Sequence, residues 1–138
     1  MRIVGLDIGT KNIGVALSDE TCTIAQSKEV VQRKKDSQAI IAIVQILDEF
    51  DAREIVVGLP INMDGREGPR AEDSRNFARK LQEKTGLPVH LWDERLSTKE
   101  MEDVLIGADV SRKKRKKVID KLAAQIILQG YLDSRYAG

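Results

Sequence analysis

The chain has 138 residues, with 23 Lys and Arg against 22 Asp and Glu, and a formal net charge of +1. This length suits a single domain over residues 1–138, and the 41% of hydrophobic residues excludes a wholly disordered chain. One cysteine excludes a disulfide framework or a cysteine zinc site. No apolar run approaches the ~18–20 residues of a membrane span, and the first 14 residues carry an acid and several glycines where a signal peptide needs an unbroken apolar stretch. We therefore expect a cytoplasmic protein without a membrane partner.

Apolar, β-branched runs between turns predict strands, and apolar residues at helical spacing predict helices. Residues 53–59 form an almost continuously apolar run, which is typical of a strand covered on both faces. Ser97 and Glu100 fit a capping box, which would begin a helix at residue 97. The predicted elements are strands 2–7, 13–18 and 23–33, helix 37–50, strand 53–59, a loop over 60–70, helix 72–84, strand 89–92, and helices 97–106 and 112–134.

The order of these elements, βββαβαβαα, predicts the fold class. Three strands in succession must be antiparallel neighbours, whereas strand–helix–strand units form right-handed parallel crossovers. We therefore expect an α/β fold with a mixed five-stranded sheet and helices on both faces. This pattern resembles an RNase H-like domain, whose first strand is central; a flavodoxin-like fold, which alternates strand and helix from the start, fits less well.

The first candidate catalytic residue, Asp7, lies in the apolar first strand. A carboxylate there is costly unless a cation or hydrogen-bond donors compensate its charge. Gly5 and Gly9 flank Asp7 and leave room for a ligand to approach the backbone. The alternative is an Asp that caps the following turn at Gly9 and Thr10.

Two adjacent acids, Asp93 and Glu94, follow the strand predicted at 89–92. Acids at the C-terminal end of a sheet strand lie at the edge where α/β proteins bind ligands. Because side chains alternate along a strand, only one of the two can point towards a site shared with Asp7. Spacing alone does not choose between them, and the other acid would anchor Arg95 or a neighbouring loop.

The third candidate, Asp120, lies in the predicted last helix, one position off an apolar stripe. Ala123 and Ala124 follow it at i+3 and i+4, on the same side of the helix. Such small side chains would let this helix approach the sheet closely. The alternative is a surface acid that pairs with the lysines around it.

These carboxylates, from the first strand, the end of the last strand and the last helix, could meet, because the first strand of an RNase H-like sheet is central and is flanked by the fourth strand and then the fifth. Clustered carboxylates repel one another unless cations intervene, so the arrangement predicts Mg²⁺ or Mn²⁺. Two such ions about 3.5–4 Å apart can promote hydrolysis of a phosphodiester. Zinc is disfavoured, because the chain has one His, His90, and one Cys, Cys22, far apart in sequence.

The near-zero net charge hides an uneven distribution. Residues 1–104 carry 15 basic and 19 acidic side chains, a net charge of −4, whereas residues 105–138 carry 8 and 3, a net charge of +5. A basic run precedes Asp120 in the same helix and could bind phosphate backbones, although such a run can also be a solvated face. The candidates for nucleic-acid binding are Lys11, Arg66, Arg70, Arg95, Arg112, Lys113, Lys114, Arg115, Lys116 and Lys117.

Four sequence blocks resemble the YqgF/RuvX family of RNase H-like proteins over essentially the whole chain. Members of this family are described as Holliday-junction resolvases and as nucleases that mature the precursor of 16S ribosomal RNA. A lone DxGT motif is a weak sign, but four blocks in this order and spacing are a strong one. The blocks are GLDIGTK (5–11) with IGVA (13–16), VVGLP (56–60) with NMDG (62–65), WDERLST (92–98), and DKLAA (120–124) with ILQ (127–129).

The resemblance implies that Asp7, Glu94 and Asp120 are catalytic, metal-binding acids, and it favours Glu94 over Asp93, which stays a secondary candidate. It implies a metal-dependent nuclease that acts on structured nucleic acid: precursor ribosomal RNA first, with branched DNA as the alternative. A two-fold DNA junction would need two active sites and hence a homodimer, whereas a monomer can process RNA, so both assemblies remain open.

Two other functions compete with the nuclease. The Asp-x-Gly-Thr motif also occurs in actin-like and hexokinase-like ATP-binding proteins, but those need a second, similar domain that 138 residues cannot supply. A non-catalytic nucleic-acid-binding factor could use the same basic helix. Metal dependence separates it from a nuclease, because a binder should work in EDTA.

Overall fold

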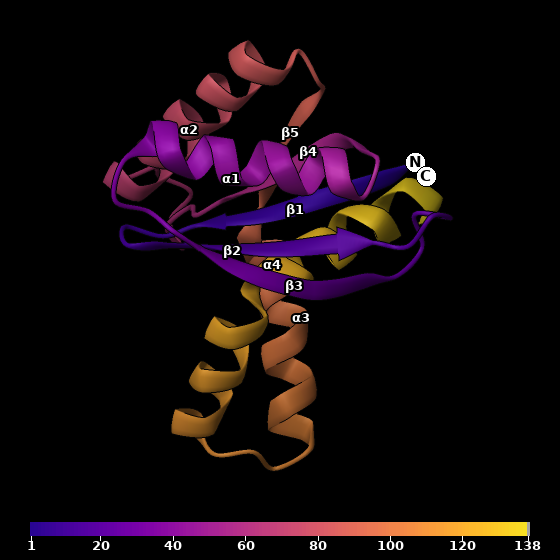
Figure 1. Cartoon of the computed structure of the whole chain (residues 1–138). Coiled ribbons are helices and arrows are strands. Elements are labelled where there is room, and N and C mark those ends of the chain that lie inside the picture. The colour runs from indigo at the N-terminus through magenta and orange to yellow at the C-terminus, as the bar shows by residue number, and fades with distance from the viewer. Residues whose placement is uncertain (138) are drawn as a thin grey trace.

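The structure is a computed structural model that describes the backbone of residues 1–137 and all of their side chains except those of 97–100, 136 and 137. Within this part of the chain, five strands form one sheet in the order β3-β2-β1-β4-β5 (Figure 1). β1 pairs antiparallel with β2 and parallel with β4, which confirms the predicted mixed sheet with a central first strand. The strands are β1 (Arg2–Ile8), β2 (Asn12–Ser18), β3 (Ala25–Gln32), β4 (Ala52–Leu59) and β5 (Val89–Asp93).

Helices cover both faces of the sheet, as predicted (Figure 1). On one face, α1 (Asp36–Glu49) and α2 (Pro69–Thr85) pack over a core that contains Phe77 and Leu81, both fully buried. On the other face, α4 (Arg112–Ala137) packs against a smaller core. Among the described helices, none combines the length and hydropathy that crossing a membrane requires.

The close approach of α4 to the sheet depends on small residues. A Cβ atom added to Gly5 would lie 2.6 Å from Cβ of Leu128 and 3.3 Å from the carbonyl oxygen of Ala124. A Cβ added to Gly14 would lie 3.4 Å from Cβ of Ala124. Of the two small residues expected to let this helix lie close to the sheet, Ala124 is the one in contact with it.

The helices α3 (Glu94–Gly107) and the first half of α4 form a hairpin that projects from the sheet (Figure 1). We call residues 96–123 the arm, which leaves out Glu94 and Arg95, the two residues that begin α3 directly after β5. α3 packs mainly against α4, and every described side chain of the arm is either half-buried or exposed. The arm is thus an outlying part of the molecule, whereas the buried residues lie in β1 to β4, α1, α2 and the second half of α4.

Three predicted element starts were wrong by two or three residues, each because local hydrogen bonding or proline chemistry moves the start, and the last helix ends at Ala137 rather than at residue 134. α3 begins at Glu94 rather than at residue 97, because the Asp93 carboxylate accepts a bond from the Arg95 backbone N–H at 3.0 Å and caps the helix. The side chains of the predicted capping box, Ser97 and Glu100, lie outside the described ones.

The other two corrections concern β3 and α2. β3 begins at Ala25 rather than at residue 23, because Asp19 Oδ1 accepts bonds from the backbone N–H groups of Thr23 and Ile24 and holds them in a turn. α2 begins at Pro69 rather than at residue 72, since proline is well suited to the first turn of a helix.

Candidate active site

Asp7 and Glu94 meet at the C-terminal end of the central strand β1, on the face of the sheet that α4 covers. Their side chains are hydrogen-bonded to each other. Burial raises the pKa of Asp7, although Arg70 and the bond from Glu94 oppose the change. Burial and the nearby Asp7 carboxylate raise the pKa of Glu94 to about 7. Below about pH 7 the pair therefore retains a proton, which Glu94 donates to Asp7.

A glycine makes room for Glu94 above the end of β4. A Cβ atom added to Gly58 would lie 2.5 Å from Oε1 of Glu94 and 2.5 Å from Cδ1 of Ile127. Gly58 is paired with Trp92 in the parallel β4–β5 register, and Glu94 follows two residues after Trp92. The absence of a side chain at Gly58 thus lets Glu94 reach across β4 towards Asp7 on β1.

Asp93 has a different role. Its carboxylate caps α3 and forms an ion pair with Arg95, with 2.8 Å between Nη2 and Oδ2. The hydrogen bond from the Arg95 side chain lowers the pKa of Asp93. The structure therefore brings Glu94 to Asp7, and Asp93 anchors Arg95, as expected for whichever acid lay outside the site.

Asp120 lies near the pair without joining it. It is exposed on α4, and its charge contributes to the raised pKa of Asp7. Among the described residues, no three His, Cys, Asp or Glu side chains form a group ready to hold a metal ion. Two of the three predicted acids are thus in contact, and the third stands close enough to act on Asp7 electrostatically.

The predicted basic residues are distributed unevenly around this pair. Arg70, exposed in the first turn of α2, opposes the pKa increase of both Asp7 and Glu94. Lys11 is exposed in the turn between β1 and β2. Arg66 is exposed and has Nε 3.6 Å from Oδ2 of Asp64. Arg95 is held by Asp93.

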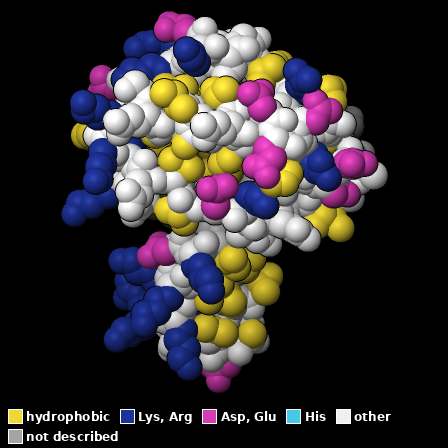
Figure 2. All heavy atoms as spheres, in the orientation of Figure 1, with side chains coloured by type: hydrophobic (Ala, Val, Ile, Leu, Met, Phe, Trp, Pro, Cys, Tyr) yellow, Lys and Arg dark blue, Asp and Glu magenta, His cyan; other side chains and the backbone are white. Residues whose placement is uncertain are grey.

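The basic run at the start of α4 borders a groove of about 1120 Å³ that also contains Asp120. Figure 2 shows Lys and Arg side chains gathered along one side of the arm, with hydrophobic side chains on the other. Positive potential therefore extends from the arm towards the carboxylates. The members of the run that line the groove are Arg112, Lys113, Arg115, Lys116 and Lys117.

Arg33 was not predicted, yet it organises this end of the molecule. Its side chain is only 9% exposed. Nη1 donates to the carbonyl of Gly9 at 2.9 Å, and the guanidinium binds Asp73 through two bonds of 2.6 and 2.8 Å and Asp36 through Nε at 2.9 Å. These bonds, Asp73 first, raise the pKa of Arg33 above its ordinary value. The only local signal was Asp36, three residues further on.

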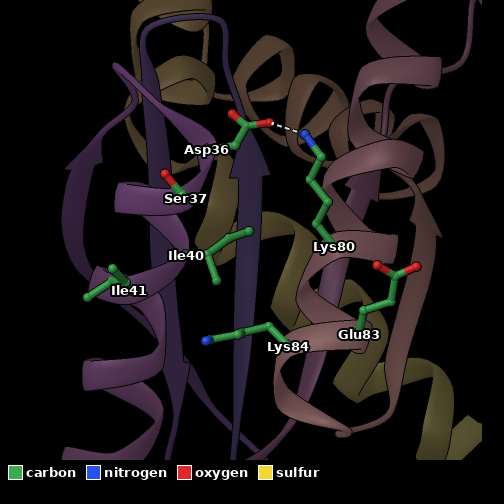
Figure 3. A pocket seen from close by; sticks show the side chains of 7 residues that line it. All are labelled: Asp36, Ser37, Ile40, Ile41, Lys80, Glu83 and Lys84. Atoms are coloured by element: carbon green, nitrogen blue, oxygen red, sulfur yellow. Dashed lines mark hydrogen bonds and ion pairs between the residues drawn. The ribbon is translucent and has the colours of Figure 1, made fainter.

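Asp36 links this network to α2 through a second cation. Figure 3 shows its ion pair with Lys80, in which Nζ lies 2.9 Å from Oδ2. The pair sits at one end of a groove of about 540 Å³ between α1 and α2. None of the residues predicted to act in catalysis or nucleic-acid binding lines that groove.

His90 lies against Glu54 and Tyr131. Nε2 lies 3.0 Å from Oε2 of Glu54, which also accepts a bond of 2.7 Å from the Tyr131 hydroxyl. The His90 ring stacks on Tyr131 with 5.3 Å between centroids. Burial and the bond to Glu54 raise the pKa of Tyr131 to about 12.

Comparison with known proteins gives a consistent result. The family model described as "RuvX: Holliday junction resolvase" matches residues 1–134. A protein of Halothermothrix orenii is 56% identical over 133 residues, which are 96% of this chain and 95% of the relative. A protein of Geobacillus kaustophilus is 55% identical over 137 residues, which are 98% of this chain and 99% of the relative. Both carry the name "Putative pre-16S rRNA nuclease".

A solved structure shows the same fold. The Thermus thermophilus RuvC structure in complex with a Holliday junction substrate aligns with a TM-score of 0.59 at 14% identity, covering 99% of this chain and 96% of that one. The mixed sheet with its central first strand is therefore RuvC-like, as the RNase H-like expectation required. By its match to the family model and by the identity of these relatives over nearly their whole length, the chain belongs to the RuvX family.

Proposed function

We propose that this protein is a metal-dependent nuclease that hydrolyses phosphodiester bonds in structured nucleic acid, with the precursor of 16S ribosomal RNA as its main substrate. The observation that carries the proposal is the pair of acids, Asp7 and Glu94, whose pKa values are both raised where a central strand and a helix start meet. Perturbed acids of this kind are typical of catalytic centres. The names of the relatives support the RNA substrate, and a cytoplasmic location is part of the same proposal.

The donor set of this site fits Mg²⁺ or Mn²⁺, which prefer carboxylate oxygens. Asp7 and Glu94 would hold the cation, and Asp120 would contribute a further carboxylate from the arm. When bound, such a cation supplies activation of the attacking water and stabilises charge on the leaving oxygen. Glu94 must release its proton to act as a ligand, so we expect metal binding and protonation to compete at this residue.

Two groups of basic residues would bind different parts of the substrate. The groove at the start of α4 would bind phosphates of the backbone by charge, without reading base sequence. Arg70 would act next to the reacting phosphate, because it already influences both carboxylates. The exposed aromatic surface is small, since aromatic residues are 4% of the chain, so recognition of backbone shape is favoured over base stacking.

Resolution of a branched DNA junction is the second candidate, favoured by the description of the family model. That activity requires two active sites, so it predicts a homodimer at working concentration. Processing of RNA makes no such demand. The oligomeric state should therefore be measured with each substrate in the same experiment, since only junction resolution requires a homodimer.

The test compares cleavage of a precursor ribosomal RNA and a four-way DNA junction, each with Mg²⁺, with Mn²⁺ and with EDTA. Asp7→Asn should lower the cleavage rate by at least about a thousandfold, because it removes a metal ligand with little change of shape. Asp48→Asn, which changes an exposed acid on α1, is the matched control. Undiminished cleavage by Asp7→Asn, or cleavage in EDTA, would refute the mechanism, and preferential cleavage of the junction would select the second candidate.

A further inference from the structure

A second pocket lies beside the carboxylate pair, between the turn that follows β1 and the first turn of α2. It has a volume of about 430 Å³. Its polar lining comes from three segments that are distant in sequence: the β1–β2 turn, the start of α1 and the start of α2. The residues that matter here are Thr10, Arg33, Lys34, Asp36, Arg70 and Asp73.

This pocket contains more positive than negative side chains, and its two acids are paired with cations. Arg33 engages both aspartates, and Lys80 adds a second cation to Asp36. Lys34 and Arg70 form no hydrogen bond or ion pair with any described side chain. Two cations are therefore available for an anion, whereas both acids of the pocket are already occupied.

Arg33 also fixes the geometry of the pocket. Its guanidinium holds the carbonyl of Gly9, next to Thr10, and the carboxylate of Asp73, one helical turn after Arg70. The turn that carries Thr10 and the helix that carries Arg70 are thus held at a constant separation. Because its donors are engaged, Arg33 serves as a rigid wall of the pocket and its position does not depend on a ligand.

The pocket and the carboxylate pair are neighbours. Arg70 lines the pocket and acts electrostatically on both Asp7 and Glu94. Thr10 follows Asp7 by three residues on the same chain segment. A phosphodiester strand that places one phosphate at the carboxylates would bring an adjacent phosphate close to Arg70.

We propose that this pocket, the Arg70 pocket, is a phosphate-binding subsite that holds the backbone phosphate adjacent to the one being cleaved. Arg70 supplies two parallel N–H donors, Lys34 a second charge and Thr10 a hydroxyl donor. The inference rests on the proposed nuclease function for its substrate, but binding tests it without cleavage. A free phosphate group has the same chemistry, so the experiment must distinguish the two sources.

The first measurement is the affinity for a nucleic acid in the Asp7→Asn background, where no cleavage is needed and the paired carboxylates cannot both be charged. Arg70→Gln should weaken binding by about tenfold, and Lys34→Gln by somewhat less, since each removes a charge-assisted hydrogen bond. The matched controls are Arg79→Gln on the same helix and Lys35→Gln next to Lys34, which are exposed, lie outside the pocket and should change affinity less than about twofold.

The second measurement neutralises single phosphates of the substrate by methylphosphonate substitution. At one position next to the cleaved bond, substitution should weaken binding to the Asp7→Asn protein but not to the Asp7→Asn/Arg70→Gln protein, because the two changes remove the same interaction. Additive effects at every position would overturn the proposal.

Two further outcomes also contradict it. If millimolar inorganic phosphate competes in an Arg70-dependent way while no methylphosphonate position couples to Arg70, the pocket takes free phosphate and not the backbone. If Arg70→Gln lowers cleavage in the otherwise unaltered protein but leaves affinity unchanged in the Asp7→Asn background, Arg70 acts on the carboxylates alone. Failure of cleavage by the unaltered protein would count against the proposed function and not against the subsite.

Discussion

The charged network around Arg33, beside the sheet, is fixed by several partners, whereas the charged side chains of the basic run in the arm are mostly exposed. Arg33 is 9% exposed and binds two aspartates and a carbonyl. In the basic run, Arg115 donates one bond of 2.8 Å to the carbonyl of Val110, and none of the residues 112–117 forms an ion pair with a described residue. The difference matches two tasks: reacting groups need a fixed position, whereas backbone phosphates are held by charge that tolerates movement.

The largest expected effect tests the arm. Replacing Lys113, Lys114, Lys116 and Lys117 by Gln should weaken nucleic-acid binding by up to about a thousandfold at roughly 0.15 M salt, because each phosphate that is no longer neutralised keeps its counterions. The slope of log affinity against log salt should shrink by about 0.9 for each phosphate that the variant no longer neutralises.

The same quadruple variant should unfold within about 0.5 kcal/mol of the unaltered protein, since these side chains are exposed. Chemical denaturation measures this directly. If the affinity and the salt slope stay unchanged, the basic run is a solvated helix face. The proposed role of the arm in binding backbone phosphates would then be wrong.

The second prediction concerns Arg33, the charged residue that several partners hold in place. Arg33→Met should lower the free energy of unfolding by about 3 kcal/mol, because it leaves Asp73 and Asp36 without their bidentate partner and Gly9 without a donor. Arg115→Met in the arm removes one bond to a carbonyl and should cost no more than about 1 kcal/mol. Equal losses in urea denaturation would contradict the distinction between the two regions.

Arg33 also shows where sequence reasoning stops. Asp7 could be predicted from its immediate neighbours alone, because an acid inside an apolar strand is unusual. The partners of Arg33 include Asp73, 40 residues away, and no local spacing indicates that contact. For the same reason, spacing left Asp93 and Glu94 equivalent; the family resemblance favoured Glu94, and the folded chain places it over Gly58 and beside Asp7.

The helix boundary next to the site failed for a different physical reason. Ser97 and Glu100 satisfied a local capping pattern, but Asp93 caps the helix at the end of β5 first. This shift of three residues places Glu94 at the first position of the helix, where the hydrogen bond to Asp7 becomes possible. Local patterns thus predicted which elements exist and supplied the candidate acids, whereas the contacts of those acids depended on tertiary packing.

The third prediction uses two glycines, one in each region. Gly58→Ala should lower the cleavage rate by about 10- to 100-fold, because the new methyl group displaces the ends of Glu94 and Ile127 and moves the carboxylate from Asp7. The fold should remain, since flexible side-chain ends can move. Gly107→Ala at the end of α3 meets nothing within 4 Å and should leave cleavage unchanged. A Gly58→Ala protein with full activity would show that Glu94 need not occupy this position.

The smallest expected effect concerns the buried pair itself. The pKa of Glu94 is about 7 in the folded protein against an ordinary 4.5, so the folded state binds the proton more tightly than the unfolded state. The stability gained from this proton is fully present below pH ~4.5 and is lost as the pH rises through about 7. Glu94→Gln cannot lose a proton, so without metal it should be more stable than the unaltered protein by about 1–2 kcal/mol at pH ~8, and the difference should vanish near pH ~4.

If the proposed function is right, Mn²⁺ should reverse this order at high pH, because a cation held by the carboxylates of the unaltered protein stabilises only the folded state. Thermal unfolding at about pH 4 and about pH 8, with and without Mn²⁺, tests both statements. If the Glu94→Gln protein gains no stability at the higher pH without metal, burial does not raise the pKa of Glu94. The site beside the sheet would then differ from the arm in how firmly its side chains are held, but not in the protonation of its acids.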